Sequence, residues 1–301
     1  MDMSRQWSSV DEQQLHLLSD KELFKLERSI ASRFMGGVPW LTVIWGFTNF
    51  AVWLSLWPLT ITGVLPLWVA FPIATICVAL CYLPSHEAQH RIIARPGEKL
   101  FWLNELLGNI SIVPLVVPFS VARLTHNQHH IHTNHTELDP DIASRSRNAW
   151  HCLTKSIANR QPGAKAAGSY GNTLRRLNTP ESHQALRTGL IFQLVHLAIL
   201  STLAWNGYAL VAAAVWWLPR LIGHTYIHFY LSWAPHHPTL GSGRYENTRA
   251  FRSRLGNIGS MGMQYHIIHH LYPTIPITRN PAAYRALRPV LQAWKCRLDG
   301  I

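Results

Sequence analysis

The chain has 301 residues, of which 48% are hydrophobic and only 14% are charged, with 13 tryptophans and a formal net charge of +12. Soluble proteins average about 25% charged residues, so this composition argues against a fully hydrated surface, and tryptophan is typical of the bilayer interface. The basic residues flank apolar stretches instead of clustering on a polar domain, which favours anionic lipid headgroups and argues against nucleic acid as a partner.

The first part of the chain is a polar segment followed by a long apolar run. Residues 1–37 are mixed polar and show no signal-peptide pattern. From Val38 to Ser85 there is no Lys, Arg, Asp or Glu, a length that corresponds to about two membrane spans of roughly 20 residues each. A charge-free run of this length argues against two buried helices of a soluble core. The break that begins at Pro58 places the two predicted spans at about 38–57 and 63–84.

The middle of the chain is less regular. Residues 100–120 are apolar but contain asparagines, a glutamate and two prolines, so we predict that they lie at the interface or re-enter the membrane without crossing it. Residues 121–186 are polar. Within them, the stretch from Arg160 to Thr179 is rich in Gly, Ala and Ser, which predicts a loop.

A second apolar pair and a basic tail complete the chain. Residues 188–206 and 208–230 predict two further spans, in which Arg220 is the one formal charge. We therefore predict an all-α membrane protein with four transmembrane helices and a cytoplasmic helical cap. Its expected parts are an N-terminal segment, a membrane domain and a C-terminal tail, at 1–37, 38–290 and 291–301.

The distribution of basic residues predicts the orientation. Four spans would place both termini and the 85–187 segment on one side of the membrane. All 27 Lys and Arg residues except Arg220 lie in these parts, and the two short connecting loops have none. By the positive-inside rule, this side is cytoplasmic. We therefore expect an integral, multi-pass protein with both termini and its active site on the cytoplasmic side.

Three histidine clusters carry the chemistry of the sequence. One has the pattern HxxxH and two have HxxHH, and on a helix residues at i, i+3 and i+4 share one face. Each cluster can therefore direct two or three imidazoles at one point, and neutral imidazole binds Fe, Zn, Cu and Ni. Eight such ligands suit two ions better than one. The predicted ligands are His86, His90, His126, His129, His130, His266, His269 and His270.

Further polar residues extend this prediction. His228 lies at the end of the fourth predicted span and is our ninth ligand, and His224, one turn earlier, is a direct ligand or supports one. We expect His236 and His237, beside prolines, to be loop residues. His132 and His135 more naturally form hydrogen bonds or face solvent. Acidic partners for the ligating imidazoles are expected among Glu87, Glu137, Asp139 and Asp141.

Two other classes of function compete with a redox site. His86-Glu87-Ala88-Gln89-His90 matches HExxH, the zinc protease motif, and Leu298-Asp299-Gly300 resembles the LDG sequence of intramembrane proteases. That LDG sequence lies outside any apolar run, and a protease leaves both HxxHH clusters unexplained. A metal buffer or transporter would need a polar path through the spans, and none is evident beyond Gln193, His196 and Arg220.

Other signals exclude common cofactors. The four cysteines form no CxxC pair and suit neither a disulfide framework nor a zinc ribbon, so we interpret them as packing residues. No GxGxxG or P-loop pattern is present, which argues against a nicotinamide or nucleotide bound by this chain.

With these motifs in hand, residues from about 38 to 290 resemble the membrane fatty acid desaturase superfamily, which includes the beta-carotene hydroxylases. The resemblance rests on the order and spacing of the histidine clusters and on their flanking residues. These are His86 to His90, Arg123 to Asn134, Asp139-Pro140-Asp141, and Gln264 to Pro273.

The resemblance implies a non-haem di-iron site with O2 as co-substrate, which oxidises an unactivated C–H bond of a lipid. His224 and His228 match family positions on the fourth span, and Asn134 and Asp141 become possible ligands or supporting residues. Fatty-acyl desaturation is the favoured reaction, with carotenoid ring hydroxylation as the alternative. No cytochrome b5 signature is present, so an external donor of the ferredoxin or cytochrome b5 type is implied.

Overall fold

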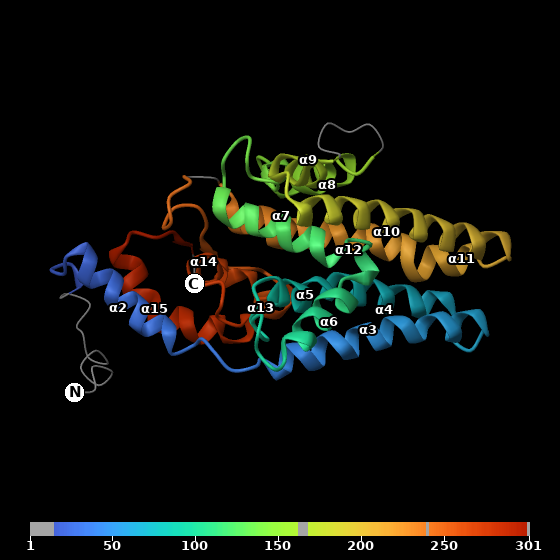
Figure 1. Cartoon of the computed structure of the whole chain (residues 1–301), viewed down its shortest axis with the longest axis horizontal. Helices are drawn as coiled ribbons and strands as arrows, with labels where there is room; N and C mark the ends of the chain where they lie inside the picture. The colour runs from blue at the N-terminus through green and yellow to red at the C-terminus, as the bar shows by residue number, and fades with distance from the viewer. Residues whose placement is uncertain (1–14, 162–167, 239–240, 300–301) are drawn as a thin grey trace.

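The structure is a computed structural model that describes residues 15–161, 168–238 and 241–299. It is an elongated helical body (Figure 1). Long helices lie side by side at one end, and short helices around the third histidine cluster form the other end. The three histidine clusters are therefore placed where the long helices meet the short ones.

The first apolar run folds into a helical hairpin that carries the first histidine cluster. Its helices are α3 (Trp40–Ile61), α4 (Leu67–Leu80) and α5 (Tyr82–Gln89). The Asn49 side chain donates to the carbonyl of Cys77 at 2.9 Å, which joins α3 to α4. The second predicted span ended at 84, but α4 and α5 together form an apolar helix from Leu67 to Gln89. His86 therefore lies on this helix and not beyond its end.

The next apolar stretch is sharply bent. Helix α6 (Phe101–Ser111) and the short η1 (Val113–Leu115) are followed by α7 (Phe119–His132), and the axis turns by 95° between them. Val116 lies in the left-handed region with a φ of 59°, and Pro118 precedes α7. This geometry belongs to a broken span or a re-entrant segment, in keeping with the prediction for 100–120. The bend turns α7, with the second histidine cluster, back toward α5.

Breaking a helix leaves its last carbonyls without backbone partners. Here the carbonyls of three consecutive residues receive side-chain donors from distant helices. Trp216 donates to Pro114 at 2.9 Å, and Gln193 donates to Val116 at 3.2 Å. The Leu115 carbonyl receives both Arg220 Nε and His224 Nε2, each at 3.0 Å. The bend is thus held by four long-range hydrogen bonds.

These donors come from the second apolar pair. Helix α10 (Pro180–Trp205) is followed by α11 (Ala209–Ala212), the π-helical η3 (Ala213–Trp217), α12 (Leu218–Ile227), the π-helical η4 (His228–Trp233) and the 3-10 turn η5 (Ala234–His236). Figure 1 shows α10 and α11 running beside each other. A π turn displaces one carbonyl from the usual ladder, and the freed carbonyl of Val215 receives Trp53 Nε1 at 3.2 Å.

Three helices in the described residues are long and apolar enough to cross a membrane, namely Trp40–Ile61, Leu67–Gln89 and Pro180–Trp205. The bent pair from Phe101 to His132 makes a fourth if it counts as one span. The fourth span predicted at 208–230 is instead a succession of short α and π segments. Its irregular turns supply the donors described above, and the four-span topology stays a prediction.

The remaining elements are short, apart from α15 (Asn280–Ala293), which packs against α2, α14, η6 and η7. They include a two-residue parallel pair of β1 (Ala250–Phe251) and β2 (Leu298–Asp299). The loop predicted at 160–179 is in part helical, because α9 (Ser169–Leu177) lies within it. Residues 162–167 of the same stretch are outside the described part. The other short elements are η2 (Ile142–Ser144), α8 (Ala149–Ala158), α13 (Gly256–Gly259), η6 (Met263–Tyr265), α14 (His266–Leu271) and η7 (Ile277–Arg279).

The N-terminal helix α2 (Asp20–Ser32) packs against α15 and is hydrogen-bonded to the residue that follows the helix of the third histidine cluster. Its Leu23 and Leu26 pack with Val290 of α15. Glu27 is fully buried and accepts hydrogen bonds from Tyr245 at 2.8 Å and from Tyr272 at 2.7 Å. Tyr272 directly follows α14, so α2 helps to fix the end of that helix.

The close approach at the bend generates a first prediction. A Cβ on Gly108 would meet the Phe119 ring at 2.5 Å, whereas a Cβ on Gly189 would make an ordinary 3.6 Å contact with Val121. Overpacking costs about 1–3 kcal/mol, and alanine in a helix returns roughly 0.5–1 kcal/mol. We expect Gly108→Ala to lower the thermal unfolding temperature in detergent, and Gly189→Ala to leave it unchanged or raise it. Equal transitions for both variants would contradict this packing.

Candidate metal centre

The three histidine clusters occupy helical segments that converge. His86 lies on α5 with His90 at its end, the second cluster is the last turn and a half of α7, and the third is the body of α14. Side chains three and four residues apart on a helix share a face. The convergence comes from the bend before α7 and from the packing of α14 beside these helices.

The first group of imidazoles combines all three clusters. It consists of His86, His90, His126 and His269, and one ring nitrogen of each lies within 4.8 Å of the others. The Nε2 atoms of His90 and His126 are 2.9 Å apart. Four nitrogens gathered in this way can hold a single metal ion.

The second group lies beside the first. It consists of His129, His236, His266 and His270, with the same spread of at most 4.8 Å between ligand atoms. His130 connects the two groups. Its Nε2 is 3.1 Å from that of His126 and 2.9 Å from that of His269, and its ring stacks on His270 with centroids 4.4 Å apart. The site therefore contains eight imidazoles in two adjacent groups and a ninth, that of His130, between them.

The structure places one predicted ligand away from both groups. His228 lies in neither group, and its Nδ1 is 3.9 Å from Cys152 Sγ. His236, which was predicted to be a loop residue, takes part in the second group. The assignment of metal ligands stays a prediction. The helical path of the chain does not stop near 230. It continues through η4 and η5 to His236, two turns beyond His228, despite Pro235 at the first turn of η5.

Other predicted residues serve structural contacts. His224 Nε2 is hydrogen-bonded to the Leu115 carbonyl and is in neither group. Glu87 is buried, and its Oε1 accepts the backbone N–H of Ile277, which ties α5 to η7. The Glu87 carboxylate therefore points to η7. Asp299, the acidic residue of the Leu298-Asp299-Gly300 sequence, forms an ion pair with Arg249 at 2.7 Å. The geometry gives no support to the HExxH protease hypothesis.

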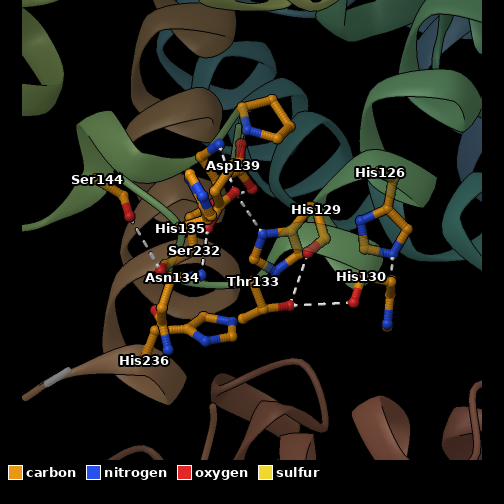
Figure 2. A network of polar contacts seen from close by, with 12 residues as sticks. His126, His129, His130, Thr133, Asn134, His135, Asp139, Ser144, Ser232 and His236 are labelled. Atoms are coloured by element: carbon orange, nitrogen blue, oxygen red, sulfur yellow. Dashed lines mark hydrogen bonds and ion pairs between the residues drawn. The ribbon is translucent and has the colours of Figure 1, made fainter. Parts of the chain in front are cut away.

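Hydrogen bonds orient the ligating rings from behind. His129 Nδ1 donates to Asp139 Oδ1 at 2.9 Å, as Figure 2 shows, and His236 Nδ1 lies 2.9 Å from the Asn247 carbonyl. Burial opposes ionisation of Asp139, but hydrogen bonds from His129 and from two backbone N–H groups lower its pKa overall. Such contacts fix which nitrogen of each ring faces a metal.

Asn134 and Asp141 support this shell without joining either group. Asn134 has a φ of 68°, its backbone N–H donates to Asp139, and its side chain donates to the Asn247 carbonyl at 2.8 Å. The Asn247 carbonyl thus accepts hydrogen bonds from the side chains of both Asn134 and His236. Asp141 accepts from Tyr170 at 3.0 Å and from Ser232 at 3.2 Å.

The pKa values of four candidate ligands suit a metal. Burial lowers the pKa of His236 to about 3. Burial and neighbouring imidazoles hold the pKa of His266, His269 and His270 well below the usual range. These rings are therefore neutral at physiological pH, which is the form that binds metal. Burial opposes the charged form of His129, but the hydrogen bond and the charge of Asp139 raise its pKa overall.

The donor set also fits transition metals. The Nε2 atoms of His86, His266 and His270 are buried and have no hydrogen-bond partner within the described residues. Buried polar atoms are normally satisfied, and a metal ion is the partner that four converging neutral imidazoles suit. Imidazole nitrogen favours Fe, Zn, Cu and Ni over Mg or Ca.

A cavity of about 520 Å³ borders the site. Both groups contribute to its wall, the first through His86 and His126 and the second through His129 and His266. Apolar side chains of α7 and α12, among them Ala122 and Ile227, line it as well. The cavity can hold part of a long apolar molecule next to both groups.

Comparison with known proteins agrees with this geometry. The sequence model of the family described as "Fatty acid desaturase" matches residues 62–297. An sn-1 oleoyl-lipid 12-desaturase of Anabaena variabilis is 38% identical over 110 residues, which is 35% of this chain and 27% of the relative. A protein of the same name from Synechocystis sp. is 36% identical over 87 residues, 28% and 21% of the two chains.

A third relative is the sn-1 acyl-lipid omega-3 desaturase (ferredoxin) of Nostoc sp. It is 29% identical over 108 residues, 34% of this chain and 26% of the relative. The alignments thus span only about a quarter of the length of these curated relatives, whereas the family model covers most of this chain.

A pair of neighbouring histidines tests which residues bind metal. Removing a ligand from a four-histidine group should release metal, so we expect His236→Ala to lower the metal content of the purified protein by about one ion per chain. His237 stacks on Trp233 and is in neither group, and His237→Ala should keep its metal. Metal analysis of both variants and of His228→Ala decides the assignment. Loss of metal only in His228→Ala would restore the original prediction.

Proposed function

Because the chain belongs to the fatty acid desaturase family, we propose that it is a membrane oxidoreductase that introduces a double bond into an acyl lipid. The reaction would remove two hydrogens from neighbouring carbons and reduce O2 to water with two electrons from an external donor. Electron transfer and O2 chemistry need a redox metal, which zinc is not.

One observation carries the proposal. Two four-histidine groups, connected by His130, face a single cavity whose wall is apolar in part. Hydrolysis needs one Lewis-acidic metal and a water molecule, so a second group and a ninth imidazole would have no role there. A paired site open to a long apolar substrate suits oxidation of a C–H bond.

We propose that the ligands of two iron ions are divided between the two groups. The first ion would be held by His86, His90, His126 and His269, and the second by His129, His236, His266 and His270. His130 would complete one of the two sets. Iron bound there would supply the redox chemistry with O2 that imidazoles alone lack.

The chain's own residues would position both iron and substrate. Asp139 and the Asn247 carbonyl hold the rings of His129 and His236 in a fixed orientation. Ala122 and Ile227 present apolar surface to the acyl chain and exclude water from the place where hydrogen is removed. His224 and Arg220 act one step further out, since they fix the start of α7.

The electron donor is proposed by its class. This chain shows no motif for a flavin or nicotinamide cofactor, and the name of the Nostoc relative specifies ferredoxin. We propose a ferredoxin-type donor that docks on the basic cap. Cytochrome b5 is the other donor class.

The proposed topology keeps both termini and the site on the cytoplasmic side, with the division at 1–37, 38–290 and 291–301 as predicted. Reporter fusions at both ends and within 162–167, a stretch outside the described residues, should all report the cytoplasm. The physical reason is the concentration of Lys and Arg in these segments. A reporter in 162–167 on the side opposite to either terminus would disprove this topology.

The reaction itself is tested in a host that makes both oleoyl lipids and beta-carotene. We expect new double bonds in acyl chains, measured by gas chromatography of methyl esters, and about two irons per purified chain. Hydroxylated carotenoid without acyl desaturation would replace the proposed reaction by the ring hydroxylation of the same superfamily. One tightly bound zinc and no iron uptake would reject the redox function.

Two histidines on one helix provide matched variants. His130 lies between the groups, whereas His132 is two residues further, about 200° around the helix. We expect His130→Ala to abolish desaturation, and His132→Ala to keep most of it, because only local hydrogen bonds of about 1 kcal/mol each are lost. Comparable activity in the two variants would contradict the proposed ligand set.

A further inference from the structure

Two arginines line the same cavity as the histidines. Arg220 lies on α12, and Arg160 follows α8, whose side chains pack against η4 and α12. Both guanidinium groups are only partly accessible to solvent. The substrate cavity of the proposed function therefore has two permanent positive charges in its wall.

Both arginines donate their hydrogen bonds to neutral acceptors. Arg160 donates to Ser156 Oγ at 2.8 Å, to Thr225 Oγ1 and to the carbonyl of Leu221. Arg220 donates through Nε to the Leu115 carbonyl. The Nε of Arg160 is buried without a hydrogen-bond partner among the described residues.

No acidic residue in the described part of the chain forms an ion pair with either arginine. The cavity's own carboxylate, Asp141, is hydrogen-bonded to Tyr170 and Ser232. The neighbouring stretch 162–167 has the sequence PGAKAA, which supplies no acid. Burial, and then the charge of Arg220, lower the pKa of Arg160. Buried charges in proteins are normally paired, because an unpaired one is costly.

Arg220 contacts the chain near the start of α7, whereas the second histidine cluster lies further along this helix. Arg220 is hydrogen-bonded to Leu115, just before α7 begins, whereas His126 is seven residues beyond the first residue of α7, roughly 10 Å further along it. Ala122 lines the cavity between these points. The cavity thus offers a cationic region, an apolar wall and then the metal-binding groups.

We propose that Arg160 and Arg220 bind the anionic group of the lipid substrate, a carboxylate or a phosphate, while its acyl chain extends toward the histidines. Guanidinium is the side chain best suited to both oxyanions. This inference rests on the proposed function, and it narrows the substrate to an acyl lipid with a negative charge. A carotenoid hydrocarbon would leave both arginines unpaired.

Binding measurements without turnover test the proposal. Full-length protein in a neutral detergent is titrated by calorimetry at pH 8 with oleic acid and with oleyl alcohol, which share one chain. Hydrogen bonds to charged groups are worth about 1.5–3 kcal/mol, so oleic acid should bind at least about tenfold more tightly. In Arg160→Gln and Arg220→Gln this preference should fall to about twofold or less.

Three variants separate charge from folding. Arg160→Lys keeps the charge and should keep part of the preference. Arg160→Gln leaves the hydrogen bonds of the α6–α7 bend in place, so its metal content should be normal. Arg176 also donates to backbone carbonyls, those of Glu137 and Leu138, but it does not line the cavity. Arg176→Gln should therefore bind both probes as the parent protein does.

A second pair of probes distinguishes a phosphate from a carboxylate. Dioleoyl phosphatidic acid is compared with dioleoylglycerol in the same variants. An arginine-dependent preference for only the phosphatidic acid would identify a phospholipid headgroup as the anion. Equal binding within both pairs, or a preference that survives in both glutamine variants, would overturn the proposal. Arginine-dependent binding without any lipid oxidation would instead contradict the proposed function and leave this site standing.

Discussion

The structure depends on satisfying the carbonyls at the bend between α6 and α7. In an apolar environment an unpaired backbone carbonyl costs several kcal/mol, so a broken helix persists only where other groups supply donors. Trp216, Gln193, Arg220 and His224 supply them to three consecutive carbonyls. These bonds, together with the packing of α7 against α5, α9 and α10, direct His126, His129 and His130 toward the other two clusters.

The periodic features of this arrangement could be predicted from the sequence. The spacing within each histidine cluster already places its rings on one helix face, and the charge-free run from Val38 to Ser85 indicates the first hairpin. The prolines and polar residues of 100–120 predicted a segment that does not cross the membrane, and the bend observed there fits either a re-entrant segment or a broken span. The family resemblance was confirmed by the match over 62–297. The histidine spacings and the apolar runs can be read from continuous stretches of the chain, without knowing which distant residues meet.

The features that could not be predicted are long-range. His236 was assigned to a loop because prolines flank it, but proline is compatible with the first turn of a helix, and the chain continues helical to that point. His224 was interpreted as a ligand or as support for one, and its partner could not be identified, because Leu115 is more than one hundred residues away in the sequence. The same carbonyl is the partner of Arg220. Glu27 gave no signal at all, since its partners Tyr245 and Tyr272 are equally distant.

Two separate sources of long-range hydrogen bonds therefore hold the helices that carry the histidines. Donors from α10, η3 and α12 hold the bend before α7, and Glu27 holds the end of α14 through Tyr272. Arg220 belongs to the first source and also carries a charge in the cavity wall. A neutral donor such as glutamine at 220 would satisfy the Leu115 carbonyl equally well, so the hydrogen bond alone does not explain a guanidinium there. The hydrogen bonds of Arg160 do not explain its charge either, because serine, threonine and carbonyl acceptors do not require a cationic donor. What the two share is the cavity, and the simplest physical reason for two unneutralised charges beside it is a ligand that brings the opposite charge.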